Sequence, residues 1–336
     1  MKLHGMIDIR VHGEQVLRDP GFWDKVKKAF GGSPDLRTDR VRTSLEAATL
    51  VEGSRQALTR LGATNAISLV IDKQVLFEDK EGHPDDLADL MAAFRDNAPV
   101  FGTNFDLLRL VVEHEEAGLH TVIEVMARSE HAANETAARV VIGGRIKDFE
   151  PRPGETAEAY RARVEPLTKT PAIFEAHRAQ FEAFVSRVAD ALRGTLADAE
   201  ISVREAEAKV EQPSQGQRPP AVAPTDHRYD PYDSYYPSPF SGLLSMMMFS
   251  SMLSWAFMPH YTVVNYAGFP LGATDTMSVD SLQAAASGQE LSSAYDGDLG
   301  GDLSGEMGGL DGGDFERSAG DFFGGDGGGG FDFGDW

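Results

Sequence analysis

The sequence predicts an α+β domain over residues 1–210, with helices and a mixed or antiparallel sheet. Short segments rich in β-branched residues alternate apolar and polar side chains, as half-buried strands do. Longer segments repeat apolar residues every three or four positions, as amphipathic helices do. After residue 210 the composition changes abruptly. We expect a Pro/Tyr-rich linker (211–239), a hydrophobic segment rich in Met, Ser and aromatic residues (240–270), and a disordered acidic Gly-rich tail (271–336).

The first elements follow from this alternation and from helix start and stop signals. In MIDIRVHG, Ile7, Ile9 and Val11 alternate with polar residues and predict the first strand. A short helix is expected over residues 19–30, and a long helix over 38–61 that ends at Gly62. Gly53 is a predicted weak point of the long helix.

Further strands and one helix are predicted before residue 150. The stretch 66–78 forms two short strands around a tight connection, and 83–98 forms a helix with acidic residues in its first turns. The stretch 138–146 adds a strand.

Residues 107–127 predict a β-hairpin with its turn at 115–118. One face is core. The other pairs Arg109 with Glu124 and Glu113 with His120 across the strands, which leaves His114 and His120 on opposite faces. The predicted core residues are Leu108, Leu110, Val112, Leu119, Ile123 and Val125.

A polar loop with four prolines is expected after this, followed by an amphipathic helix over 172–194. Leu196, Ala199, Val203, Ala206 and Val210 continue the three-four spacing and predict a second, charged helix. The two helices are a coiled-coil candidate for self-association, and the alternative is packing on the protein's own sheet.

Charge and cysteine content limit the classes of function. The 336-residue chain has a formal net charge of −22, and residues 229–336 hold 16 acidic residues against one base, Arg317. Phosphate backbones would repel such a surface, so we do not expect nucleic acid as a partner. The absence of cysteine excludes disulfides and thiolate chemistry. The first residues lack the apolar run of a secretory signal, which predicts a cytoplasmic amino-terminal domain.

The sequence HEEAGLH prompts a test for metal binding. A zinc site on a helix needs histidines four residues apart, but His114 and His120 are six apart and lie in a predicted hairpin. Glu113, His120 and Glu124 are therefore weak metal candidates, and ordinary surface pairing is the preferred interpretation. We assign no catalytic residue and no cofactor.

The hydrophobic segment allows three interpretations. Residues 240–258 are uncharged and about as long as a membrane span requires, so the segment is a candidate single transmembrane helix that anchors the domain to the inner membrane. Self-association or partner binding and packing within the molecule are the alternatives. Its principal residues are Phe240, Leu243, Leu244, Met247, Phe249, Leu253, Trp255 and Phe257.

The last residues, GGGFDFGDW, combine aromatic side chains with carboxylates. Aromatic anchors with steering charges are typical of docking peptides. The predicted docking residues are Phe331, Asp332, Phe333, Asp335 and Trp336.

The layout predicts a non-enzymatic, membrane-associated adaptor or scaffold whose acidic aromatic tail recruits protein partners. The first alternative is a soluble scaffold that assembles with itself without touching a membrane. The second is an enzyme or metal-binding protein that uses the 107–127 hairpin.

Overall fold

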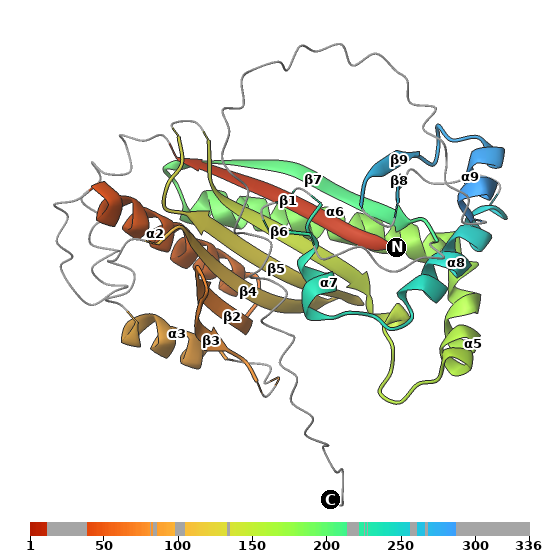
Figure 1. Ribbon diagram of the computed structural model, residues 1–336, viewed down its shortest axis with the longest axis horizontal. Helices are drawn as coiled ribbons and strands as arrows, with labels where there is room; N and C mark the ends of the chain where they lie inside the picture. Colours follow the sequence, from red (N-terminus) through yellow and green to blue (C-terminus); the bar gives the residue numbers. More distant parts are fainter. Residues whose placement is uncertain are drawn as a thin grey trace, which may run out of the picture. The chain divides into compact units, whose positions relative to one another are not determined.

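The protein contains a nine-stranded sheet among the residues that its computed structural model describes (Figure 1). Those residues are 1–11, 39–80, 82, 86–97, 105–132, 135–213, 222–224, 226, 228–255, 261–265 and 268–286. The strand order is β3-β2-β4-β5-β6-β1-β7-β8-β9. Neighbouring strands are antiparallel except β7 and β8, which run parallel. The predicted mixed domain of helices and sheet is confirmed.

The sheet joins segments from distant parts of the sequence, since the first strand lies between the sixth and the seventh. The strands are β1 (Lys2–Val11), β2 (Asn65–Ile71), β3 (Gln74–Glu78), β4 (Leu107–Glu116), β5 (Leu119–Arg128), β6 (Thr136–Ile146), β7 (Ala199–Glu211), β8 (Thr262–Val264) and β9 (Pro270–Ala273).

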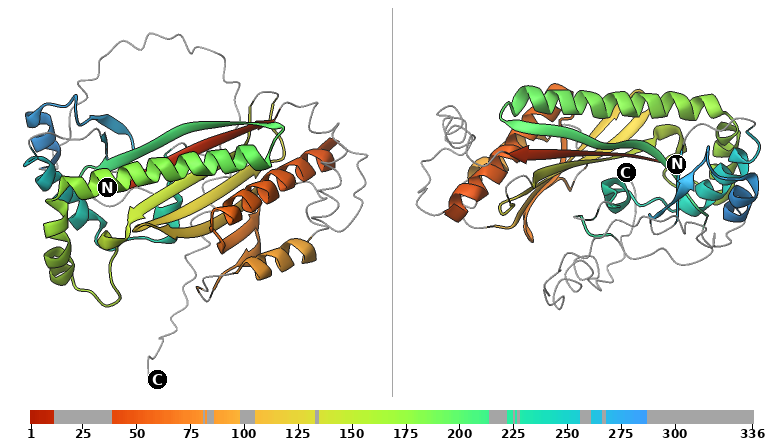
Figure 2. Two further views of the ribbon diagram at one scale, coloured as in Figure 1. Left: turned by 180° about the vertical axis from the view of Figure 1, so that it is seen from behind. Right: turned by 90° about the horizontal axis from the view of Figure 1, so that it is seen from above.

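Two long helices, α2 and α6, cover one face of the sheet, and the short helix α7 lies on the opposite face (Figure 2). The helices are α2 (Asp39–Arg60), α3 (Leu87–Asp96), the 3-10 helix η1 (Lys147–Phe149), α5 (Ala157–Thr168), α6 (Pro171–Thr195), α7 (Pro231–Tyr235), α8 (Ser241–Met252) and α9 (Val279–Ala286). The main apolar core lies between the sheet and the two long helices, where Leu110, Ile123 and Phe181 are completely buried.

The 107–127 hairpin has the predicted faces but a different register. Ala117 (φ 52°) and Gly118 (φ 78°) form a two-residue turn in the left-handed region, and Arg109 pairs with Met126. The predicted register was two residues out, because the turn is shorter than expected. The shift keeps each side chain on its predicted face, since strand side chains repeat every two residues.

The predicted second helix after residue 194 is wrong, because the chain there forms β7. Its Ala, Glu and Lys residues favour a helix, but propensity is a weak prior. The edge of β1 offers unpaired backbone groups, and β7 satisfies them along a ladder from Lys2–Lys209 to Val11–Ala199. The coiled-coil candidate therefore has no second helix.

The predicted polar loop contains η1 and α5. Thr156 caps α5 by accepting a hydrogen bond from the backbone N–H of Ala159 at 3.3 Å. Tyr160 and Val164 are completely buried, and Pro166 is accommodated inside the helix. A loop is predicted for these residues because of the four prolines, although the apolar residues of α5 have helical spacing.

Gly53 lies where α2 passes the end of α6. A Cβ atom there would lie 2.5 Å from Cδ2 of Leu196. The glycine predicted as a weak point of the helix therefore allows a close approach.

The hydrophobic segment forms α8, a helix of 12 residues. Its length is about 18 Å, and none of the helices in the described parts of the chain is long and apolar enough to cross a membrane. The transmembrane helix predicted over 240–258 is not found among the described residues: α8 ends at Met252, and residues 256–258 lie outside them. Leu244, Met247 and Phe249 are buried, Phe240, Leu243 and Trp255 are half-buried, and Leu253 is 37% exposed. Phe257 lies outside the described residues.

Residues beyond the predicted domain boundary at 210 belong to the same compact unit, which runs from Met1 to Ser292. The aromatic ring of Phe240 stacks on Tyr160 of α5 at 4.6 Å between centroids, and Ser251 donates a hydrogen bond to Thr168 at 2.9 Å. Residues 271–286, predicted as the start of the tail, include α9 and all of β9 except its first residue, Pro270. The predicted helix over 19–30 and the tail from residue 287 lie outside the described residues.

Candidate functional site

The face of the sheet opposite α2 and α6, here called the polar face, carries several ionisable side chains. Strand periodicity directs every second residue of β1, β4, β5 and β6 to it. Several are buried, including Glu124 at 0%, His4 at 3% and Arg145 at 8% exposure. Ionised groups are costly to bury without partners. The segment that covers the polar face therefore has to supply hydrogen-bond and ion-pair partners.

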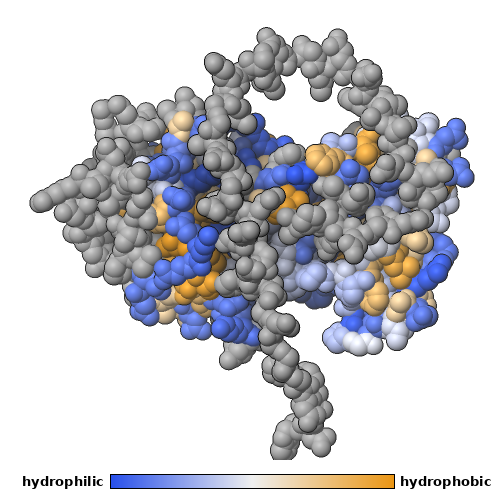
Figure 3. Space-filling view, in the orientation of Figure 1, coloured by the Kyte–Doolittle hydropathy of each residue, from blue (hydrophilic) through white to orange (hydrophobic). Residues whose placement is uncertain are grey.

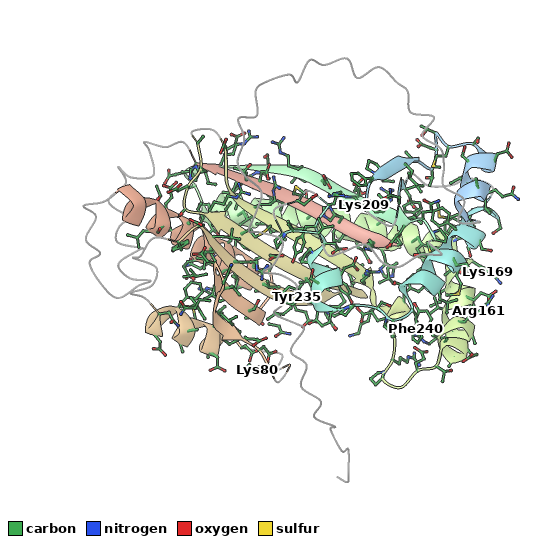
Figure 4. All side chains as sticks on the ribbon, in the orientation of Figure 1. Lys80, Arg161, Lys169, Lys209, Tyr235 and Phe240 are labelled. Carbon is green, nitrogen blue, oxygen red and sulfur yellow. The ribbon has the colours of Figure 1, made fainter. Side chains whose placement is uncertain are left out.

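Residues 228–236, with the sequence RYDPYDSYY, lie over the polar face and are called the strap. Asp230 caps α7 by accepting a hydrogen bond from the backbone N–H of Tyr232 at 3.0 Å, and Pro231 occupies the first helical position. Figure 4 shows Tyr235 on this helix, in front of the strands. Contacts of α7 with β5 and β6 place the strap on the sheet.

Gly143 of β6 allows the strap to approach the sheet closely. A Cβ atom at this position would lie 2.2 Å from Oδ1 of Asp230 and 3.0 Å from the backbone nitrogen of Tyr232. Any larger residue would therefore push the strap away from the polar face.

The first anchor of the strap is Asp233. Lys2 of β1 and Arg145 of β6 both donate hydrogen bonds to its carboxylate. The guanidinium of Arg145 also lies over the ring of Tyr232, 5.1 Å from the centroid. Burial disfavours charge on Lys2, but the carboxylates of Asp233 and Glu211 outweigh it and raise its pKa.

The second anchor is centred on His120 of β5. Its Nδ1 lies 2.5 Å from Oε1 of Glu150, and its Nε2 is hydrogen-bonded to Glu113. Tyr232 donates a hydrogen bond to Glu150, and Tyr236 hydrogen-bonds to Glu113. Burial opposes the imidazolium, but the two carboxylates raise the pKa of His120 to about 9.

The third anchor is at the start of the strap. His4 Nε2 lies 3.1 Å from the carbonyl oxygen of Tyr229. Beside it, Glu124 forms an ion pair with Nε of Arg109 at 3.1 Å. Burial raises the pKa of Glu124 to about 7, although Arg109 opposes the shift.

The sequence-predicted pairs are both present. Arg109 contacts Glu124 and Glu113 contacts His120, each as a diagonal neighbour in the observed register. These pairs are not ordinary surface pairs, because they are largely buried beneath the strap. His114 points to the opposite face and stacks on Phe184 of α6, with ring centroids 5.3 Å apart. Within the described parts of the chain, no three His, Asp or Glu side chains are arranged to hold a metal ion.

Sequence reasoning missed Lys2, Arg145, Glu150 and the role of the strap. The tyrosines of the strap were assigned to a linker. Two local signals point to the site: Asp-Pro at 230–231 marks a helix start, and Gly143-Gly144 inside a strand marks a close backbone approach. The predicted docking residues of the tail lie outside the described residues.

Comparison of the sequence with protein-family models finds no match, and neither curated proteins nor solved structures give one.

Proposed function

We propose that this protein is a non-enzymatic adaptor whose polar face binds a peptide rich in tyrosine and aspartate. In the free chain the strap is the occupant of that surface. A partner peptide of similar chemistry would compete with the strap and replace it.

The observation that carries the proposal is the way in which the strap contacts the sheet. Its side chains make separate, residue-specific contacts: Asp233 with two cations at the first anchor, Tyr232 with Glu150 at the second, and Tyr235 with Ser68 at 3.2 Å outside the anchors. Peptide-recognition surfaces combine such side-chain pockets with close backbone approach, which Gly143 provides here.

The strap also differs from an apolar core segment. It shares a small apolar cluster with the sheet, in which Val111, Val122 and Tyr232 are buried. Its other contacts include hydrogen bonds, ion pairs, a cation–π contact and ring contacts with His120 that a partner peptide could reproduce. Exchange of one polar occupant for another leaves the main core between the sheet and the two long helices unchanged.

A direct test uses a fluorescein-labelled peptide of residues 226–239 and the full-length protein. The double variant Tyr232→Ala/Asp233→Asn weakens the strap while it leaves the sheet residues unchanged. We expect this variant to bind the peptide at least ten times more tightly than wild type, because the native strap competes in cis. Equal, negligible binding by both proteins, with the variant shown to be folded by circular dichroism, would contradict the proposal.

A second candidate function, assembly with itself, is favoured by α8. Met246 is 58% exposed and Leu253 is 37% exposed on this helix, and Figure 3 shows apolar surface where α8 and α5 lie. Exposed apolar patches often mark interaction sites. Sedimentation velocity of wild type and Met246→Glu tests this candidate, which predicts a larger species for wild type alone.

A further inference from the structure

The contact of Asp233 with Lys2 and Arg145 has more donors than one carboxylate uses. Lys2 Nζ bonds to Oδ2 and Arg145 Nη2 bonds to Oδ1. Nε of Arg145, in a side chain that is nine-tenths buried, has no hydrogen-bond partner among the described residues. Buried donors are normally satisfied, so Nε of Arg145 is a donor that another acceptor oxygen could satisfy once the strap is displaced.

The strap also brings a second acidic side chain to this point, that of Asp230. Asp230 is half-buried near Asp233, and desolvation together with the charge of Asp233 raises the pKa of Asp230. Both carboxylates interact with Lys2 and Arg145. When the strap leaves, both depart with it, and Glu211 remains 3.3 Å from Lys2.

A phosphate group matches these two features. It carries about −1.5 to −2 charges at pH 7 and presents three acceptor oxygens. Arginine binds such a group through two parallel N–H donors, which here would be Nε and Nη2 of Arg145. Lys2 supplies a further donor and a second positive charge.

We infer that the Lys2–Arg145 pair, once the strap is displaced, binds a phosphorylated residue of the partner peptide. This inference rests on the proposed function and names the partner chemistry. The residue is phosphoserine rather than phosphotyrosine, because the short side chain of Asp233 already reaches both cations from a backbone held close to the sheet.

The test compares peptides of residues 226–239 on the Tyr232→Ala/Asp233→Asn protein by fluorescence anisotropy. The residue at position 233 of the peptide is aspartate, asparagine, phosphoserine or phosphotyrosine. We expect the phosphoserine peptide to bind at least ten times more tightly than the aspartate peptide, and the asparagine peptide to bind most weakly. The protein variant Asp233→Asn, which perturbs the strap less, serves as a second host if the double variant is unstable.

Arg145→Lys is the matched control, introduced into the same host. Lysine keeps the charge but lacks the forked donors, so the preference for phosphoserine over aspartate should fall to less than threefold. A preference that survives Arg145→Lys would overturn the assignment of Nε.

The outcomes separate the inference from the proposed function. If the aspartate peptide binds and phosphoserine gives no gain, or phosphotyrosine binds best, the inference fails and the proposed function stands. If no peptide binds, both fail. If inorganic phosphate displaces the aspartate peptide as effectively as the phosphoserine peptide does, the pair is a free-anion site and the phosphopeptide inference is wrong.

Discussion

The hydroxyl group of Tyr232 lies 3.3 Å from Nδ1 of His120, although 112 residues separate them in sequence. Both groups contact the same carboxylate, that of Glu150. Tyr232 belongs to the strap and His120 to a central strand, so this triple contact connects the covering segment to the polar face of the sheet.

Tyr232→Phe is expected to destabilise the protein by about 1.5–3 kcal/mol, because it removes a hydrogen bond to a charged group. Tyr235→Phe is the matched control, since its hydroxyl contacts the neutral Ser68 and its loss should cost about 0.5–1.5 kcal/mol. Urea unfolding measures both changes. Equal losses of stability in the two variants would mean that the hydrogen bond from Tyr232 to Glu150 is no stronger than one to a neutral group.

Gly143→Ala is expected to destabilise the protein by about 1–3 kcal/mol through overpacking against Asp230 and Tyr232. It should also speed trypsin cleavage after Arg228, because the strap is pushed from the sheet. Gly242→Ala is the control, since a Cβ atom there meets nothing within 4 Å. Limited proteolysis with unchanged cleavage in Gly143→Ala would refute the close approach.

The free energy of unfolding is expected to fall as pH rises from about 6.5 to about 9. The folded-state pKa of His120 is raised from 6.5 to about 9, so its stabilising contribution is complete below pH 6.5 and is lost through pH 9. Burial opposes ionisation of Glu113 and Glu150, but hydrogen bonds from His120 outweigh it and lower both pKa values. The contribution of these two carboxylates to the free energy of unfolding is therefore lost as pH falls below 4.5. His120→Gln should flatten the alkaline slope in urea titrations.

Glu124 should produce a separate slope at lower pH. Its pKa is raised from 4.5 to about 7, so the stability associated with its protonated form is present below pH 4.5 and is lost as pH rises through 7. Glu124→Gln should remove this slope and leave the one between pH 6.5 and 9. Loss of both slopes in one variant would show that the anchors do not titrate independently.

Arg109→Met is expected to cost about 3–5 kcal/mol, because it leaves the buried carboxylate of Glu124 unpaired. The double variant Arg109→Met/Glu124→Leu should cost less than this single variant, since it removes the uncompensated charge as well. Thermal unfolding of the wild type and of these two variants compares the two losses of stability. A double variant that is less stable than Arg109→Met would contradict the assigned cost of burial.

Phe249→Ala is expected to lower the free energy of unfolding by about 3–5 kcal/mol, because Phe249 is 1% exposed in the core that α8 shares with the sheet. It should also lower the midpoint temperature at which the sheet unfolds. Met246→Ala, at the 58% exposed position, should change stability by less than about 0.5 kcal/mol. A separate, earlier transition for α8 alone would support the modular layout expected from the sequence.

Local patterns of the sequence determined the faces of the first strand and of the 107–127 hairpin. Alternation assigned Ile7 and Leu110 to the core, and it assigned Glu113 and His120 to the opposite face. It also located the long helices, with an end at Gly62. These features depend on backbone periodicity, which is a property of neighbouring residues.

Tertiary structure alone decided where β7, α8 and the strap lie. The residues of β7 favour a helix, but the unpaired edge of β1 gave their backbone groups better partners. In sequence the strap resembles a linker. In the structure its aspartate and tyrosine side chains contact Lys2, Arg145 and His120 of the sheet. Hydrogen bonds and charges between distant segments decide such positions, and sequence periodicity carries no information about them.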